Sequence, residues 1–265
     1  MRKLRSGKLV AAFAVLLVVS FAVMNAMPSD TLPAALLQET VLALVAFAAV
    51  GFAIPDALKR CTQTVQQRSI VRFTAITLLL VGLVGGAITL LAWLFAGGGT
   101  MAGFASTALP SAVDLMENLL LLLGICLLTG LYEESFMRVL GIGAFEQALD
   151  TKRAILASAA LFALLHVGAP DVSAGQLVLL QAALKFGQAL LFGVTLGALY
   201  VRTRRLWPCA FIHAGFDVLY LAPNVLLTGM MPETYASGAV GDTVLLAVSV
   251  LMLSGIVLKI RKEIA

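Results

Sequence analysis

Charge is scarce in this sequence. Only 12% of the 265 residues are Asp, Glu, Lys or Arg, and 61% are hydrophobic, whereas a soluble domain is about 25% charged. This scarcity excludes an ordinary soluble domain, and the net charge of +4 gives no reason to expect a nucleic acid partner. The mean hydropathy of +1.02 instead predicts an all-α, polytopic integral membrane protein.

Cysteine is also rare, and long polar segments are absent. Cys61 lies in a predicted loop, and Cys126 and Cys209 lie in apolar segments, so no pair predicts a structural disulfide. The sequence contains no HExxH, the helical zinc-binding motif of many metalloproteases. No repeat or polar linker divides the chain, so we expect one transmembrane domain over residues 1–265.

The sequence has instead a series of apolar segments. Most of them are long enough to cross about 30 Å of hydrocarbon, and the fifth is short. The first could also be a signal peptide, but no convincing cleavage site follows it, so we expect it to be retained. We predict eight transmembrane helices, at residues 8–27, 34–55, 73–96, 117–137, 154–169, 176–201, 206–227 and 243–260.

The basic residues predict the orientation. If the eight helices alternate, 16 of the 18 Lys and Arg residues fall on one side of the membrane and none on the other, with Arg138 and Lys185 inside spans. Cytoplasmic loops carry an excess of basic residues. We therefore predict a multi-pass protein of the cell (inner) membrane with both termini in the cytoplasm.

Ionisable side chains nevertheless occur inside the apolar segments. Such groups cost about 2.5–3.5 kcal/mol each at the centre of a span on insertion scales. Their clustering therefore predicts a functional polar pocket within the bundle. Three helices carry them: Glu133, Glu134 and Arg138 in the fourth, His166 in the fifth, and His213 and Asp217 in the seventh.

Helical spacing separates the two adjacent glutamates. Glu134 and Arg138 are four residues apart and share a helix face, which predicts an ion pair, whereas Glu133 points about 140° away from Arg138. Glu133 is then available as a general base for a water molecule. In the alternative interpretation, both glutamates lie at the membrane surface and extend into water.

The same spacing applies to the histidines. Asp217 follows His213 by four residues, so we expect its carboxylate to orient the imidazole. Cys209 precedes His213 by four residues, and a thiol nucleophile is a weaker alternative. Lys185 either lines the same cavity or extends to the interface, and Glu39 is expected at the interface.

The segment that follows Arg138 has its own pattern. Residues 139–150, VLGIGAFEQALD, have spaced apolar positions. This spacing is typical of a helix that lies in the membrane surface. We therefore predict a short interfacial helix over the opening of the pocket.

Three short motifs carry a resemblance. EESFMR at 133–138 fits EExxxR, FALLH at 162–166 fits FxxxH, and HAGFD at 213–217 fits HxxxN/D, in this order. The chain therefore resembles the CPBP family of CAAX prenyl proteases and bacteriocin-processing enzymes, also called the ABI family. The resemblance runs over residues 115–226, which we expect to form the catalytic core.

The resemblance implies a hydrolase, an intramembrane endopeptidase. Its substrate would be a peptide or protein with a hydrophobic or lipidated end, such as a CAAX-like protein or a leader peptide. Glu133 would activate the water and His166 would help to hold it, while Phe162 would be a packing residue. The remaining motif residues would complete the catalytic set: Glu134 and Arg138 as support, and His213 and Asp217 for the oxyanion.

Two questions stay open in the sequence. The CAAX endopeptidases of this family carry Asn where this chain has Asp217, and an ionised Asp would repel an oxyanion. Glu133, His166 and His213 would also make a ligand set of the kind that catalytic zinc accepts, so a divalent metal such as zinc is an alternative to a metal-free glutamate-dependent enzyme.

Two other functions are compatible with the same residues. A bacteriocin-immunity or scaffold protein of the same fold would bind a peptide without cleaving it. A small transporter would also use buried Glu, His and Lys, although no inverted repeat supports this alternative.

Overall fold

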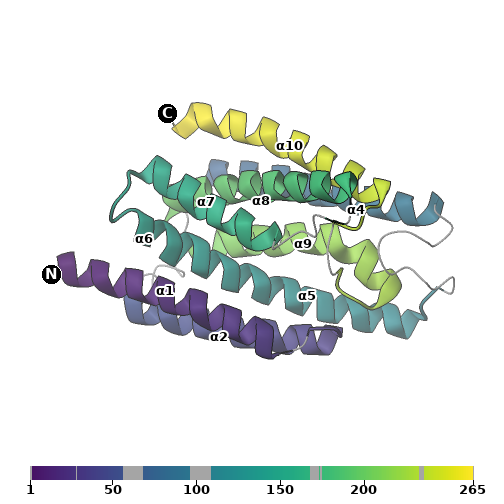
Figure 1. The fold of residues 1–265 in the computed structure, drawn as a ribbon, viewed down its shortest axis with the longest axis horizontal. Helices are drawn as coiled ribbons and strands as arrows, with labels where there is room; N and C mark the ends of the chain where they lie inside the picture. Colours follow the sequence, from purple (N-terminus) through teal and green to yellow (C-terminus); the bar gives the residue numbers. More distant parts are fainter. Residues whose placement is uncertain are drawn as a thin grey trace.

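The computed structural model describes residues 2–27, 29–55, 68–95, 109–167, 173, 175–232 and 236–264, and no strand occurs among them. Each predicted span corresponds to one long helix (Figure 1). Cys61 and the last residues of the predicted third and fifth spans lie outside the described residues. The helices are α1 (Arg2–Ala26), α2 (Leu32–Ala53), α4 (Arg68–Phe95), α5 (Ala112–Glu134), α7 (Thr151–Val167), α8 (Gln176–Thr203), α9 (Leu206–Thr228) and α10 (Val240–Ile264).

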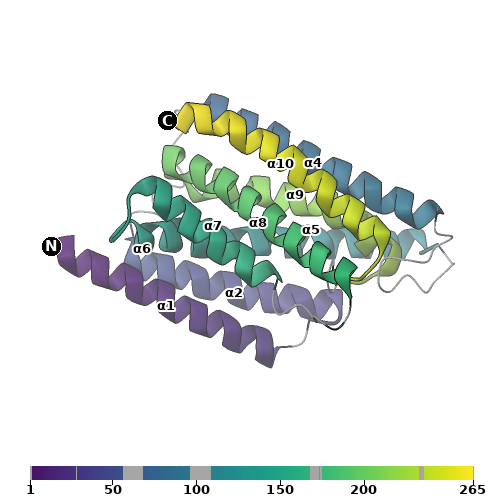
Figure 2. The same ribbon diagram turned by 45° about the horizontal axis from the view of Figure 1, so that its top comes forward.

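The lengths of these helices confirm the all-α polytopic fold. Seven of the described helices are long and apolar enough to cross a membrane, and α7, with 17 described residues, is shorter. The chain is therefore a multi-pass membrane protein. Helix α1 begins and helix α10 ends at the same end of the bundle in both views (Figures 1 and 2), as an even number of spans requires.

Helix α9 lies at the centre of the packing. It contacts α5 on one side and α4 on the other, and α7 packs on α8. Glycine allows a close approach of α5 to α9, because a Cβ atom at Gly130 of α5 would lie only 2.6 Å from the carbonyl oxygen of Ala210 in α9. Gly130 is one turn before Glu134, and Ala210 is one turn before His213, so this approach brings the two polar side chains together.

The prediction of an interfacial helix at 139–150 is wrong in its first half. Helix α5 continues directly into the π-helix η2 (Ser135–Ile142), all of whose residues are buried, and then into the short α6 (Gly143–Phe145). Ser158 of α7 donates a hydrogen bond to the carbonyl oxygen of Met137 at 2.7 Å. Spaced apolar residues occur both in interfacial helices and in buried ones, and here the neighbouring helices cover them.

A bidentate ion pair fixes the end of this segment. Arg204, in the left-handed conformation at the end of α8, donates to both carboxylate oxygens of Glu146, at 3.0 and 2.9 Å. These hydrogen bonds raise the pKa of the Arg204 guanidinium. The chain that leaves α6 is therefore attached to the end of α8.

Candidate active site

Glu134 and Arg138 form the predicted ion pair. Arg138 Nε donates to Glu134 Oε2 at 2.9 Å, and both side chains are 0% exposed. The pair is therefore buried within the bundle. The alternative in which Glu134 extends into water at the interface is wrong, because α9 and η2 cover the end of α5.

The second oxygen of Glu134 reaches across to α9. His213 Nδ1 lies 2.9 Å from Glu134 Oε1, and the ring is buried. An ionised carboxylate only accepts hydrogen bonds, so Nδ1 carries the proton of this contact. Glu134 thus holds the imidazole at Nδ1 by a hydrogen bond, in addition to the expected neighbour Asp217. Asp217 Oδ2 lies 3.4 Å from the other ring nitrogen, Nε2.

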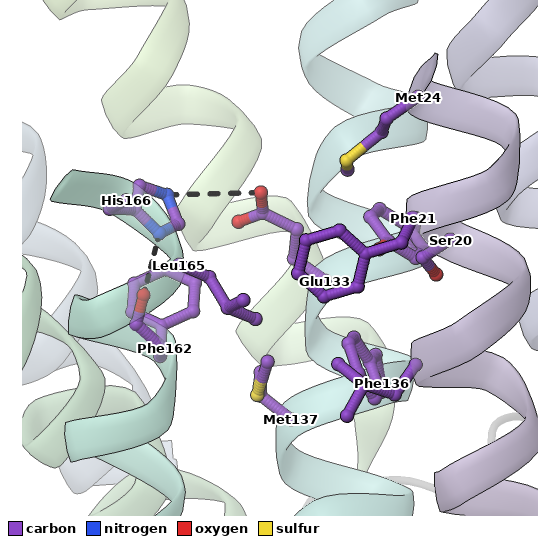
Figure 3. A pocket seen from close by; sticks show the side chains of 11 residues that line it. Ser20, Phe21, Met24, Glu133, Phe136, Met137, Phe162, Leu165 and His166 are labelled. Atoms are coloured by element: carbon purple, nitrogen blue, oxygen red, sulfur yellow. Dashed lines mark hydrogen bonds and ion pairs between the residues drawn. The ribbon is translucent and has the colours of Figure 1, made fainter. Parts of the chain in front are cut away.

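His166 is oriented by its own helix. Its Nδ1 lies 2.9 Å from the carbonyl oxygen of Phe162 one turn earlier in α7. A carbonyl oxygen can only accept, so this nitrogen is the donor. The other ring nitrogen, Nε2, faces Glu133 Oε1 at 3.8 Å (Figure 3).

Glu133 lies between the two histidines. Its Oε2 is 3.6 Å from His213 Nε2, and this oxygen is buried without a hydrogen-bond partner. A separation above about 3.5 Å between polar groups is typical of a bridging water. The carboxylate thus faces both Nε2 atoms across gaps that suit a water molecule.

Phe162 packs against two of the polar side chains. Its ring centroid is 4.1 Å from that of His166, and the Arg138 Cζ atom lies 4.9 Å from the ring centre. The two terminal nitrogens of Arg138 are buried without hydrogen-bond partners, and a cation over an aromatic face is stabilised in such a dry site. Phe162 is therefore a packing residue that also contacts the buried cation.

Part of the chain matches a known protein family. Residues 115–219 match the family model described as type II CAAX prenyl endopeptidase Rce1-like. This segment is Rce1-like. The resemblance drawn from the three motifs is thereby confirmed, and at the level of the family it indicates a CAAX-type intramembrane protease. No curated protein matches the chain.

The metal alternative depends on how the His and carboxylate donors are grouped. Among the described residues, no three His, Cys, Asp or Glu side chains are grouped so that they could hold a metal ion. Glu133 turns one oxygen toward His166 and the other toward His213. The described residues therefore give the metal alternative no support.

A cavity of about 170 Å³ opens beside Glu133 and His166. Helix α1, which precedes the Rce1-like segment, forms its far wall (Figure 3). Phe21 and Met24 of α1 and Leu165 of α7 line the cavity and are 50%, 47% and 38% exposed. The cavity is thus mostly apolar, with Glu133 and His166 as its ionisable residues, and its α1 and α7 walls reach the surface that faces lipid.

Two further polar residues belong to the surroundings of the site. Glu39 of α2, which we expected at the interface, shares a hydrogen bond with Thr129 and interacts electrostatically with Glu133 and His213. None of the three motifs includes Glu39, and α2 lies before the Rce1-like segment. The Cys209 thiol points to the carbonyl oxygens of Leu196 and Arg205, which gives the thiol nucleophile no support.

Proposed function

We propose that the protein is an intramembrane endopeptidase that hydrolyses a peptide bond of a substrate with a hydrophobic or lipidated end, with Glu133 as the base. One observation carries the proposal. The partnerless oxygen of Glu133 is 3.6 Å from His213 Nε2, and the other oxygen is 3.8 Å from His166 Nε2. A water molecule in this space contacts a base and two imidazoles at once.

The reaction follows from these contacts. The water gives one proton to Glu133 and keeps the other, which makes a hydrogen bond to His166 Nε2, and its oxygen attacks the carbonyl carbon of the substrate. The electron pair of the C=O bond moves to the oxygen, and His213, protonated at both nitrogens, donates Nε2–H to this oxyanion. Glu133 then returns its proton to the amide nitrogen, the C–N bond breaks, and a carboxylic acid and an amine are released.

The cavity supports a substrate that arrives within the bilayer. An apolar cavity of about 150 Å³ holds a benzene molecule, so a cavity of about 170 Å³ accommodates roughly one apolar side chain next to the scissile bond. Its half-exposed α1 and α7 walls face lipid, and a lipid-anchored chain can approach from that direction. The cytoplasmic orientation of this end remains the prediction made from the basic residues.

The test compares two substitutions on the same helix. Glu133→Gln keeps the shape of the side chain and removes the base, so we expect kcat to fall by about 10²–10⁴-fold. Glu117→Gln, at an exposed position of α5, should cleave like the wild type. The purified proteins would be incubated in detergent with prenylated and unmodified C-terminal peptides, and the products identified by mass spectrometry.

Three outcomes would revise the proposal. Equal cleavage by Glu133→Gln and the wild type would remove Glu133 from the mechanism. Retained peptide binding without cleavage by either protein would favour a scaffold or immunity function. A chelator should leave cleavage unchanged. Loss of cleavage in the presence of the chelator would instead indicate that Glu133, His166 and His213 are metal ligands.

A further inference from the structure

Helix α8 contributes a lysine that no motif includes. Lys185 is partly buried in the middle of this span, and its Nζ donates to Gln188 Oε1 at 3.2 Å. Gln188 in turn donates to the hydroxyl of Tyr220 in α9 at 2.8 Å. Gln188 therefore links the ammonium group of Lys185 to Tyr220 of α9.

The packing of α8 on α9 places this group near Asp217. Phe192, on the same face of α8, lies 4.8 Å from the His213 ring and 4.8 Å from the Phe216 ring, centre to centre. In α9, Asp217 lies between Phe216, which contacts Phe192 of α8, and Tyr220, which accepts a hydrogen bond from Gln188 of α8. Lys185 attracts the carboxylates of Asp217 and Glu133.

This position bears on the electrostatics of the oxyanion. His213 Nε2, the donor in the proposed reaction, lies 3.4 Å from Asp217 Oδ2. An ionised carboxylate at that distance would repel the oxyanion. A buried ammonium group is likewise costly unless it is paired. A carboxylate and an ammonium group placed near each other would each offset the cost of the other.

We propose that Lys185 is a positioning residue that acts through Asp217, as the counter-charge that lets this carboxylate stand beside the oxyanion. The inference rests on the proposed endopeptidase function. It gives Asp217 and Lys185 the combined role of a neutral pair in which neither residue works without the other. Glu133 keeps its role as the base.

The test is a double-mutant cycle. Asp217→Asn and Lys185→Met each leave one buried charge without its partner, so we expect each to lower kcat by about 10²-fold, with KM little changed. The double variant should recover most of the activity, although it lacks both groups. Lys259→Met, at an exposed lysine of α10, is the control and should behave like the wild type.

Thermal unfolding in detergent gives a second readout of the same four proteins. Each single variant should unfold at a lower temperature, and the double variant should regain most of the loss. This readout needs no substrate, so stability rescue without any cleavage by the wild type would overturn the proposed function and keep the charge pair. Losses in unfolding temperature and in kcat that simply add in the double variant would overturn the inference.

Discussion

At the scale of the residue, the site depends on the two oxygens of Glu134. One accepts from Arg138 and the other from His213. Removing one partner of a buried ion pair costs about 3–5 kcal/mol, because the other charge stays buried and unpaired. We therefore expect Arg138→Met to lower the free energy of unfolding by that amount, measured by chemical denaturation in mixed micelles.

The control for this prediction is an exposed ion pair. Arg153 and Asp150 are 3.3 Å apart, with side chains 76% and 56% exposed. Exposed pairs contribute about 0–1 kcal/mol, so Arg153→Met should change the stability little. Similar losses in the two variants would contradict the special cost of the buried pair.

The same residue shows how far the sequence could predict the site. The Glu134–Arg138 pair follows from a four-residue spacing within one helix. The Glu134–His213 bond joins residues 79 positions apart, and it depends on how α5 packs against α9. Helical spacing pointed instead to Asp217 as the partner of His213, since it gives only neighbours within a helix. The place of Glu39 near Glu133 and His213 likewise depends on packing between helices.

At the scale of the element, the approach of α5 to α9 has one critical position. A Cβ atom at Gly130 would lie 2.6 Å from the Ala210 oxygen and 3.2 Å from the Ala214 nitrogen, so the helices must separate. We expect Gly130→Ala to destabilise the fold by about 1–3 kcal/mol and to lower kcat, because Glu134 loses its hold on His213. Cleavage rates and thermal unfolding would measure both effects.

Gly255 of α10 provides the matched substitution. A Cβ atom there meets nothing within 4 Å. Alanine favours a helix over glycine by about 1 kcal/mol, so Gly255→Ala should be neutral or slightly stabilising. A neutral effect of Gly130→Ala as well would show that the α5–α9 approach is less tight than the structure has it.

The wall formed by α1 leads to a second element-scale prediction. Met24 lines the cavity beside Glu133, and a larger side chain would take space from the substrate. We expect Met24→Trp to raise KM for apolar peptides by about 10-fold or more with little change in kcat. Val18→Trp, at a position of α1 that is 68% exposed, should leave KM unchanged. Steady-state kinetics with peptides of increasing side-chain size would separate the two variants.

The element η2 explains another difference between sequence and structure. The number and order of the helices follow from apolar lengths near 20 residues, and all eight were predicted. The continuation of α5 through Ser135–Ile142 as a buried π-helix was not. Its apolar spacing is the same whether lipid headgroups or α1 and α7 cover it, and only the packing decides.

At the scale of the whole molecule, the orientation decides which substrates can reach the site. The connection that follows α6 lies at the same end of the bundle as both termini (Figure 1). That end carries Arg153, Arg204 and Arg205, and the positive-inside rule predicts that it is cytoplasmic. His213 is eight residues past Arg205, about 12 Å along α9. This distance is less than half of the hydrocarbon thickness of about 30 Å, so the predicted orientation places the site nearer to the cytoplasmic surface than to the outer one.

Thiol labelling in intact cells tests this orientation. Asp30 and Asp150 are exposed and belong to connections at opposite ends of the bundle. In a Cys61→Ser background, we expect a membrane-impermeant maleimide to label Asp30→Cys in intact cells and Asp150→Cys only after permeabilisation. Cys126 and Cys209 are buried and should stay unlabelled. The reverse pattern would place this end outside the cell, and lipidated cytoplasmic proteins could then not be the substrates.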